Sequence, residues 1–226
     1  MKFAFIGSPG SGYEDWIPLL TERYNVCHIS SRDMVLRAIR EESDSGKRAK
    51  ASIDAGKGVN EDLGFEILAE SMRRPECKDG YVLDGVPGNI SQAYRLEKMG
   101  EKLDAVVKLS VPDEIVVEIN SGRWIHATSG RVYHDKYDPP KEPGFDDDTG
   151  EPLQQKKSDR KEVVEERLKL FHENMSLVDA YYSKRELLHF VDGHQEMEKV
   201  KDQLFKCLDP FRKGQSWFKS FFSGSK

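Results

Sequence analysis

The chain has 226 residues, of which 37% are hydrophobic, 10% aromatic and 33% charged, and its formal net charge is −5 at pH 7. This length suits one sizeable domain or one domain with insertions, and the apolar content is sufficient for a core. The negative net charge gives no overall basic field for nucleic acid, and no apolar run approaches the length of a membrane-spanning helix.

The three cysteines, Cys27, Cys77 and Cys207, are odd in number and widely spaced. No two of them stand in the close pair that a zinc site requires, so no metal site is predicted. The pattern favours a reduced intracellular compartment over a disulfide framework, and leaves open whether this is the cytoplasm or an organelle. The N-terminus enters a predicted strand almost at once, so we expect no signal or transit peptide.

A glycine-rich turn follows the first predicted element, a short buried strand at residues 3–6, and precedes an amphipathic helix predicted at 13–23. Its glycines are Gly7, Gly10 and Gly12. The order strand, glycine turn, helix N-terminus is typical of a phosphate-binding P-loop, which continues with Lys and then Ser or Thr. Here the last glycine is followed instead by Tyr13, Glu14 and Asp15. The loop therefore lacks its cation and carries two anions.

Strand-like runs and helical periodicity alternate along the rest of the chain. The predicted strands are Lys2–Ile6, Asn25–Ile29, Tyr81–Leu83, Ala105–Leu109 and Leu188–Val191. The predicted helices are 13–23, 31–42, 46–54, 60–73, 90–99, 112–122, 160–183 and 195–208. This alternation predicts an α/β fold in which a parallel sheet is covered on both faces and holds its ligand at the carboxyl ends of the strands.

Two segments interrupt the alternation. Residues 30–59 are helical without an intervening strand, and residues 122–159 are rich in Gly, Pro, Asp, Lys and Tyr. The second segment contains only short strand-like pieces such as Arg131–His134. Both segments are predicted to be insertions at the rim of the sheet, and a long insertion beside a ligand site is commonly a lid.

Several motifs together resemble the adenylate kinases of the long-lid type. They run in family order and at family spacing from residue 1 to about 208, and comprise Gly7–Gly12, Asp33-Met34, residues 54–57, 83–85, 87–92, 111–114, 122–123, 126–134 and 146–151, Arg167-Leu168 and Tyr181-Tyr182. The resemblance implies a P-loop nucleoside monophosphate kinase-like parallel sheet with a helical NMP-binding insertion and a lid. It divides the chain into a core (1–29, 60–121 and 160–208), the insertion (30–59), the lid (122–159) and a tail (209–226).

The family transfers a phosphoryl group between ATP and AMP with magnesium, which depends on positioning and on cations that neutralise phosphate charge. The resemblance implies that several such cations are missing here. Tyr13 stands at the position of the P-loop lysine. Leu36, Gly88 and Ile119 stand at arginine positions, and Lys156 replaces a further arginine, which keeps the charge but loses the bidentate fork.

Other positions of the family pattern are kept. The resemblance implies residual nucleotide binding by Gly7, Gly10, Gly12, Ser31, Lys57, Val59, Gly85, Gln92, Arg123, Val132, Tyr133 and Arg167. In the lid, His126, Ser129, Asp146 and Thr149 match positions where relatives carry zinc ligands or a hydrogen-bonded polar set. Because the soft thiolates are missing, the polar network is the preferred interpretation, and no metal is expected.

The tail beyond residue 208 mixes Trp and Phe with Lys and Arg, as in Trp217-Phe218-Lys219. Basic and aromatic composition suits a groove on a protein partner or a membrane surface, whereas the alternatives are that the aromatic residues pack on the domain itself or that this end is disordered. We expect docking through 209–226 to a protein partner in a larger assembly, and no nucleic-acid partner.

These departures lead to the hypothesis of an adenylate kinase-like pseudoenzyme that serves as a structural or regulatory subunit with little or no phosphoryl transfer. Two alternatives stay open. One is an impaired but active adenylate or nucleoside monophosphate kinase that converts ATP and AMP to two ADP. The other is a sensor that binds AMP or adenosine. No cofactor is required by the first hypothesis; AMP or ATP is a candidate ligand, and magnesium is implied only for an active enzyme.

Overall fold

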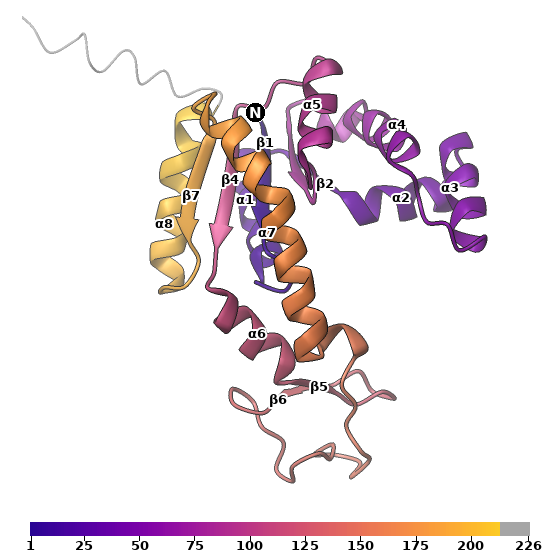
Figure 1. Cartoon of the computed structure of the whole chain (residues 1–226), viewed down its shortest axis with the longest axis vertical. Helices are drawn as coiled ribbons and strands as arrows, with labels where there is room; N and C mark the ends of the chain where they lie inside the picture. The colour runs from indigo at the N-terminus through magenta and orange to yellow at the C-terminus, as the bar shows by residue number, and fades with distance from the viewer. Residues whose placement is uncertain (213–226) are drawn as a thin grey trace, which may run out of the picture.

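The computed structural model describes residues 1–212, in which a central parallel sheet confirms the predicted α/β class (Figure 1). The strand order is β2-β3-β1-β4-β7, and every neighbouring pair is parallel. The strands are β1 (Lys2–Gly7), β2 (Cys27–Ser30), β3 (Tyr81–Asp84), β4 (Ala105–Ser110) and β7 (Leu188–Asp192), while β5 (Arg123–Ile125) pairs antiparallel with β6 (Val132–His134) outside this sheet.

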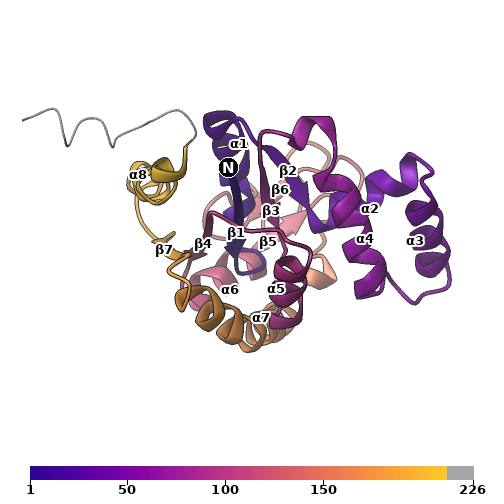
Figure 2. The same cartoon turned by 90° about the horizontal axis from the view of Figure 1, so that it is seen from above.

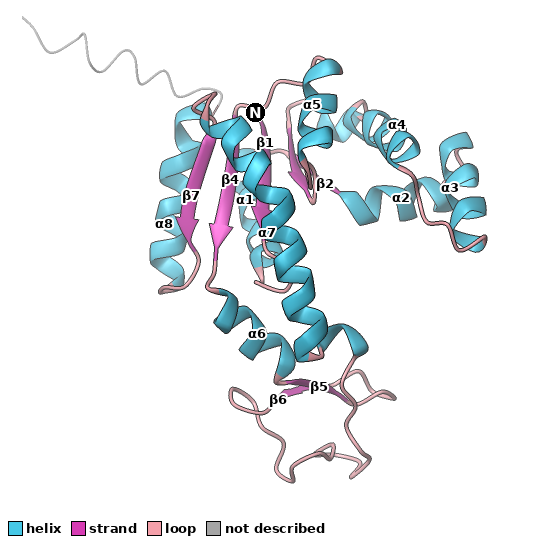
Figure 3. Ribbon diagram, viewed as in Figure 1, coloured by secondary structure: helices cyan, strands magenta, loops and turns pink. Residues whose placement is uncertain are grey.

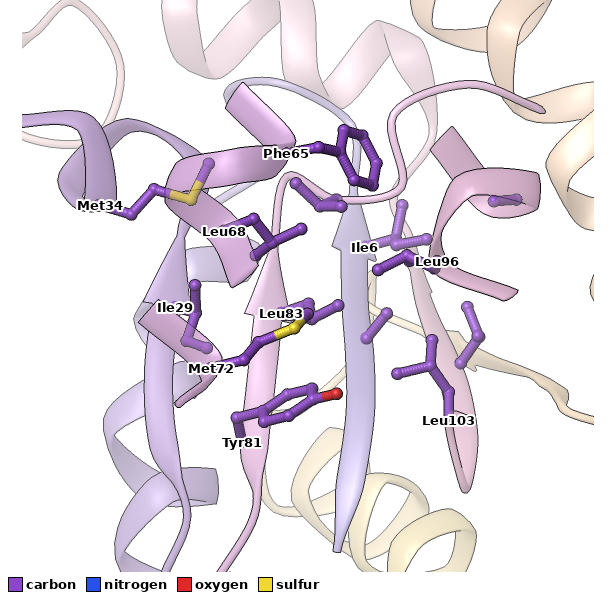
Figure 4. Close-up of a cluster of buried hydrophobic side chains, with 14 of the residues drawn as sticks. Ile6, Ile29, Met34, Phe65, Leu68, Met72, Tyr81, Leu83, Leu96 and Leu103 are labelled. Carbon is purple, nitrogen blue, oxygen red and sulfur yellow. The ribbon is translucent and has the colours of Figure 1, made fainter. Parts of the chain in front are cut away.

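Helices cover both faces of the sheet (Figure 2). The α-helices of residues 1–212 are α1 (Ile17–Tyr24), α2 (Ser31–Arg40), α3 (Asp44–Asp54), α4 (Glu61–Met72), α5 (Ile90–Lys98), α6 (Asp113–Ser121), α7 (Lys161–Ser183) and α8 (Met197–Leu208). Alternate residues of β1 face opposite sides: Phe3 and Phe5 pack with α1 and α8, whereas Ala4 and Ile6 lie in the cluster that α4, α5 and α7 cover. Figure 4 shows this second cluster.

The two segments that interrupt the alternation lie on different sides of the sheet. In Figure 1, α2, α3 and α4 project beside β2, at one edge. β5 and β6 lie beyond the carboxyl ends of the strands, past α6 and the first turns of α7. The carboxyl ends of the strands are therefore flanked by two projections. One is a helical arm made of α2, α3 and α4, and the other is a loop-rich arm that contains β5 and β6. Within residues 1–212, no helix is long and apolar enough to cross a bilayer.

The predicted helix 13–23 is wrong at its start. A 3₁₀ turn, η1 (Tyr13–Trp16), follows Gly12, and the α-helix begins only at Ile17. Pro18 supplies the reason, because in an α-helix that ran through Glu14 the proline ring would clash with the Glu14 carbonyl. The glycine loop therefore does not open directly into an α-helix.

The cysteine prediction is also wrong, because Cys27 and Cys77 form a disulfide with a Cα–Cα distance of 5.0 Å. Cys27 begins β2, and Cys77 ends a 3₁₀ turn, η2 (Pro75–Cys77), just before β3. The cysteines meet because β2 pairs with β3 in a register that sets Cys27 opposite Tyr81. Cys207 is free. The cysteine pattern thus gives no support to a reduced compartment.

The described chain ends at a short turn, η4 (Asp209–Phe211), that packs on the core. Asp209 accepts hydrogen bonds from the Arg23 guanidinium at 2.8 and 3.1 Å and from the Tyr24 hydroxyl at 2.9 Å. The Phe211 ring lies edge-on to His189 of β7. Residues 209–212 therefore belong to the folded unit, and the aromatic part of the predicted tail, 213–226, lies outside the described residues.

Candidate functional site

Tyr13 fills the space above the first glycine of the loop. A Cβ atom on Gly7 would lie 2.4 Å from the ring carbon Cγ of Tyr13, so the ring stacks directly on the glycine backbone. Tyr13 is 8% exposed, and its ring lies edge-on to Phe5 with the centroids 5.7 Å apart. The residue at the lysine position is thus part of the core, and it points inward.

The Tyr13 hydroxyl contacts a buried carboxylate. It donates a 2.6 Å hydrogen bond to Oδ1 of Asp84, the last residue of β3, and His28 Nε2 of β2 lies 3.0 Å from Oδ2. Burial, followed by the hydrogen bond to Asp84 and its charge, raises the pKa of Tyr13. Tyr13 therefore stays protonated at neutral pH and acts as a donor to Asp84.

Two features of the loop work against an incoming phosphate. Loss of water around Glu14, together with the charges of Asp84 and Asp15, raises the pKa of Glu14, which indicates a crowded anionic corner. The α-helical dipole, which attracts anions at a helix N-terminus, begins at Ile17 and is displaced from Gly12 by η1. The loop therefore has the glycine turn, but these two features weaken its attraction for anions.

A cavity of about 830 Å³ adjoins the loop and is here called the loop cavity. Its lining includes Gly10, Ser11, Gly12, Glu14, Asp15, Arg32, Ile119, Arg123, Ser158, Asp159 and Arg167. Arg123 is held by a bidentate pair with Asp159, at 2.9 and 3.0 Å. Burial opposes ionisation of Asp159, but the hydrogen bond from Arg123 outweighs it and lowers the pKa of Asp159. This cation is therefore already partnered.

Three buried donors at or near the loop cavity are not partnered. The hydroxyls of Ser8 and Ser11 and Nε of Arg167 are buried and have no hydrogen-bond partner within residues 1–212. Buried donors in folded proteins are normally satisfied by protein or by water. An anionic ligand in the loop cavity is therefore a chemically suitable partner for Arg167 and Ser11, which both line it.

The remaining positions where cations were expected to be missing are open to solvent. Leu36 on α2 is 47% exposed and Ile119 on α6 is 37% exposed. Gly88 donates its N–H to Oε1 of Gln92 at 2.7 Å, and Lys156 is exposed just before a short 3₁₀ turn. None of these places a cation in the loop cavity.

A second cavity of about 280 Å³, here called the Ser31 pocket, lies between the helical arm and the end of β3. Four predicted residues meet in its lining, which contains Ser31, Met34, Val35, Val59, Asn60, Glu61, Gly64, Phe65, Leu68, Gly85, Val86 and Gln92. Gly85 has a φ of +75°, and a Cβ there would lie 2.4 Å from the Ser31 hydroxyl. Lys57 is exposed between α3 and α4 and does not line it.

The four predicted residues of the lid come together in one polar network, although most of the lid is loop (Figure 3). His126 Nδ1 lies 2.7 Å from the Ser129 hydroxyl, and the Thr149 hydroxyl donates to Asp146 at 2.9 Å. Arg131 adds a bidentate pair to Asp146 at 2.5 and 2.7 Å. These bonds, first of all those from Arg131, hold the pKa of Asp146 far below its usual range.

Two further lid residues lie apart from the loop cavity. Tyr133 is 7% exposed; its hydroxyl donates to Asp146 and accepts the Asp147 N–H, each at 3.0 Å. Val132 is 52% exposed, and neither residue lines the loop cavity. Tyr133 therefore holds the lid network together in this structure.

The loop does not fit a magnesium-bound triphosphate in this conformation. Magnesium is usually held by one or two carboxylates together with the phosphates of the substrate. Each oxygen of Asp84 already meets a ring group, from Tyr13 or His28, and Asp15 stands where a P-loop has its hydroxyl. Within the described residues, no three His, Cys, Asp or Glu side chains are grouped as metal ligands.

Sequence reasoning did not identify His28 or Asn120. Asn120 is 2% exposed, and its Nδ2 donates to the carbonyls of Gly10 at 2.9 Å and Val116 at 2.7 Å, which fixes the glycine loop. Both residues reach the loop from other elements, so no local motif marks them. Glu151 lies in the motif 146–151, but the motif does not predict its contact with His126 Nε2, at 2.6 Å.

Comparisons with known proteins agree with this architecture. The family model "Adenylate kinase" matches residues 5–187. "Adenylate kinase 4" of Arabidopsis thaliana is 38% identical over 211 residues, which cover 92% of this chain and 86% of that protein. "Adenylate kinase" of Francisella philomiragia subsp. philomiragia is 36% identical over 215 residues, which cover 92% of this chain and 100% of that protein.

Proposed function

The chain belongs to the adenylate kinase family, and from that premise we propose that it binds adenosine-type ligands but transfers phosphoryl groups far more slowly than its relatives. The observation that carries this proposal is Tyr13, whose ring covers Gly7 and whose hydroxyl donates to Asp84. Removing a single electrostatic donor to a transition state typically costs about two to three orders of magnitude in rate.

The ligand-binding half of the proposal rests on the Ser31 pocket. Its lining contains no Lys, Arg or His, and its one carboxylate, Glu61, accepts a hydrogen bond from Ser91 and lies 3.7 Å from Arg95. An uncharged nucleoside suits such a lining better than a free phosphate group does, because a desolvated phosphate needs a cation. AMP or adenosine is therefore the ligand class to test first.

The test combines turnover with binding on the full chain. We expect ADP formation from ATP and AMP with magnesium to be at least about 100-fold below that of a relative that carries the P-loop lysine. We expect calorimetry to show heat with adenosine. Turnover within tenfold of the relative contradicts the catalytic half of the proposal, and no heat at millimolar adenosine and AMP contradicts the binding half.

A working adenylate kinase is the second candidate, and two observations favour it. Relatives named adenylate kinases align with 92% of the chain. Buried, unpartnered donors on Ser11 and Arg167 face a cavity large enough for a ligand. In that case ATP displaces the Tyr13 ring, and the same assay shows magnesium-dependent turnover.

We further propose that the chain acts within a larger assembly and docks through its C-terminal tail. The support is the basic and aromatic composition of residues 213–226, such as Trp217-Phe218-Lys219. Because Asp209 pairs with Arg23 and Tyr24, a deletion should begin at residue 213 and leave the core intact. Partners that are captured equally with and without residues 213–226 contradict this docking mode.

A further inference from the structure

The Cys27–Cys77 disulfide closes the base of the helical arm. Cys27 is the first residue of β2, and Cys77 lies just before β3, so residues 28–76 form a covalently closed loop. That loop contains α2, α3 and α4 entirely. The disulfide thus joins the point where the chain leaves the sheet to the point where it returns.

Both cysteines face a third cavity of about 140 Å³, here called the arginine pocket. Its lining includes both cysteines together with Asp33, Met34, Arg37, Arg40 and Arg74. Cys77 is 6% exposed, whereas Cys27 is only partly buried. A small molecule therefore reaches the Cys27 sulfur more easily than the Cys77 sulfur.

One cation at this pocket has no ion-pair partner. The Arg37 guanidinium lies 2.8 Å from carboxylates of both Glu41 and Glu76, and Arg74 pairs with Glu41 at 2.5 Å. These two arginines hold the pKa of Glu41 at about 2. Arg40 is exposed, and no ion pair is found for it in the part of the chain that the structure describes. Asp33 also lines the pocket without an ion pair among residues 1–212, so Arg40 is the cation there that is left for an anion, and Asp33 partly offsets its charge.

We propose that Cys27–Cys77 is a reversible redox site, reduced by a small carboxylate-bearing thiol that Arg40 attracts into the arginine pocket. Coulomb attraction over a few ångströms near a protein surface raises the local concentration of such a thiol and is weakened by salt. The site is distinct from the loop cavity and from the Ser31 pocket, and does not depend on catalysis.

The exchange proceeds in two balanced steps. The thiolate of one thiol attacks the Cys27 sulfur, the Cys27–Cys77 bond breaks, and Cys77 leaves as a thiolate while a mixed disulfide forms on Cys27. A second thiolate attacks the sulfur of the bound small thiol, which releases Cys27 as a thiolate and yields the oxidised dimer of the reagent. Two electrons pass to the protein, and both cysteine thiolates take up protons from solvent.

Reduction frees the base of the arm. Met34 on α2 lines both the arginine pocket and the Ser31 pocket, so movement of α2 at one pocket is transmitted to the other. Figure 4 shows Met34 and Ile29 on the β2 side of the buried cluster, which also contains Leu68 and Met72 of α4. We therefore expect the reduced chain to exchange backbone hydrogens faster across 28–76 than the oxidised chain does.

The first experiment measures the thiol chemistry on the full chain with Cys207→Ser, so that only two thiols can appear. Glutathione and the cationic thiol cysteamine are compared, each normalised to its rate with a small soluble disulfide. We expect glutathione to be favoured about threefold or more at low salt, and a glutathione adduct at Cys27 by mass spectrometry. Arg40→Gln removes the preference, whereas the matched control Arg48→Gln on α3 keeps it.

Two results overturn the proposal. One is that Cys27 and Cys77 both titrate as free thiols in air-oxidised protein. The other is that Arg40→Gln and Arg48→Gln behave alike. Hydrogen exchange then tests the release of the arm: reduced protein and the Cys27→Ser/Cys77→Ser variant should both exchange faster across 28–76. Unchanged exchange in both shows that the disulfide does not restrain the arm.

Discussion

The lid and the phosphate loop both place carboxylates around a tight turn, but they neutralise them differently. In the lid, Asp146 is met by Arg131, by the Tyr133 and Thr149 hydroxyls and by backbone N–H groups. In the loop, Asp84 meets Tyr13 and His28, and no lysine or arginine contacts it within residues 1–212. The carboxylate of the lid is therefore neutralised by arginine without a ligand, whereas the carboxylate of the loop meets a tyrosine hydroxyl and an imidazole.

On the proposal that phosphoryl transfer is slow, the contrast explains how the family architecture persists while the chemistry changes. The lid network stabilises the lid itself, so its residues serve folding. A phosphate-binding cation has no partner in the protein until the substrate binds. Its loss therefore changes the free energy of folding little. The following predictions test this difference, from the largest expected effect to the smallest.

Restoring the loop cations should change activity most. Leu36 and Ile119 are exposed, and a Cβ on Gly88 would meet only ordinary contacts, at 3.5 Å, so all three accept arginine without strain. We expect the variant Tyr13→Lys/Leu36→Arg/Gly88→Arg/Ile119→Arg to gain at least about 100-fold in ADP formation. Tyr13→Lys alone should gain less than tenfold, because residues that act as a unit are not additive.

The four-residue variant needs a check on folding, because Tyr13 is buried. Circular dichroism and the melting temperature provide it. If Tyr13→Lys alone gives the whole increase in ADP formation, the rest of the site can already support phosphoryl transfer. The difference between loop and lid is then due to Tyr13 alone.

Removing the central carboxylate of the lid should loosen the lid alone. Asp146→Asn leaves Arg131 without its bidentate partner, and we expect faster hydrogen exchange across 126–151 with little change in the core sheet. The matched control is Asp148→Asn, whose carboxylate is largely exposed and pairs with Arg131 at 2.9 Å. Equal effects of the two substitutions would contradict the central role of Asp146.

Each region contains a buried tyrosine, Tyr13 in the loop and Tyr133 in the lid, so the same hydroxyl can be removed from both. Tyr13→Phe removes the bond to Asp84, and we expect it to lower the free energy of unfolding by about 1.5–3 kcal/mol, as for hydrogen bonds to charged groups. Tyr133→Phe should instead act locally in the lid. Denaturant titration measures the first and hydrogen exchange the second. Tyr94→Phe is the control, because its ring is half exposed.

The pH dependence of the two regions should have opposite signs. The pKa of Glu14 is raised in the folded chain, so its stability contribution is present at low pH and is lost as the pH rises through that pKa. The pKa of Asp146 is lowered, so its contribution is present above the usual Asp pKa, about 4, and is lost as the pH falls.

Two variants isolate these signs in urea titrations. The free energy of unfolding of Glu14→Gln should rise relative to that of the parent chain as the pH increases from about 4 to about 7. The cost of Asp146→Asn should shrink as the pH falls below about 4. Parallel pH profiles for the two variants would remove the distinction between loop and lid.

Much of this fold was predictable, because its signals are local. The alternation of Phe3 and Phe5 with Ala4 and Ile6 reflects a strand buried on both faces, and seven of the predicted helices lie close to their observed bounds. β5 was not predicted, because a three-residue strand carries too little periodicity. The late start of α1 follows from Pro18, a signal present in the sequence but not used.

The contacts that define the site depend on which strands are neighbours in the sheet. Local patterns in a single sequence do not predict this order. His28 reaches Asp84, and Cys27 reaches Cys77, only because β2 lies beside β3. Asn120 reaches Gly10 from α6 in the same way. The family resemblance predicts which cations are missing, whereas the inward orientation of Tyr13 is visible only from the packing around Gly7.

The closed loop 28–76 also changes how the molecule responds to cutting. Glu42, between α2 and α3, is exposed in a turn with a φ of +53°, which is the kind of site that proteases reach first. After a single cut there, the two pieces remain joined through Cys27 and Cys77. The nicked chain therefore migrates as one band on a denaturing gel and separates into two only after reduction, so the gel reports the state of the disulfide directly.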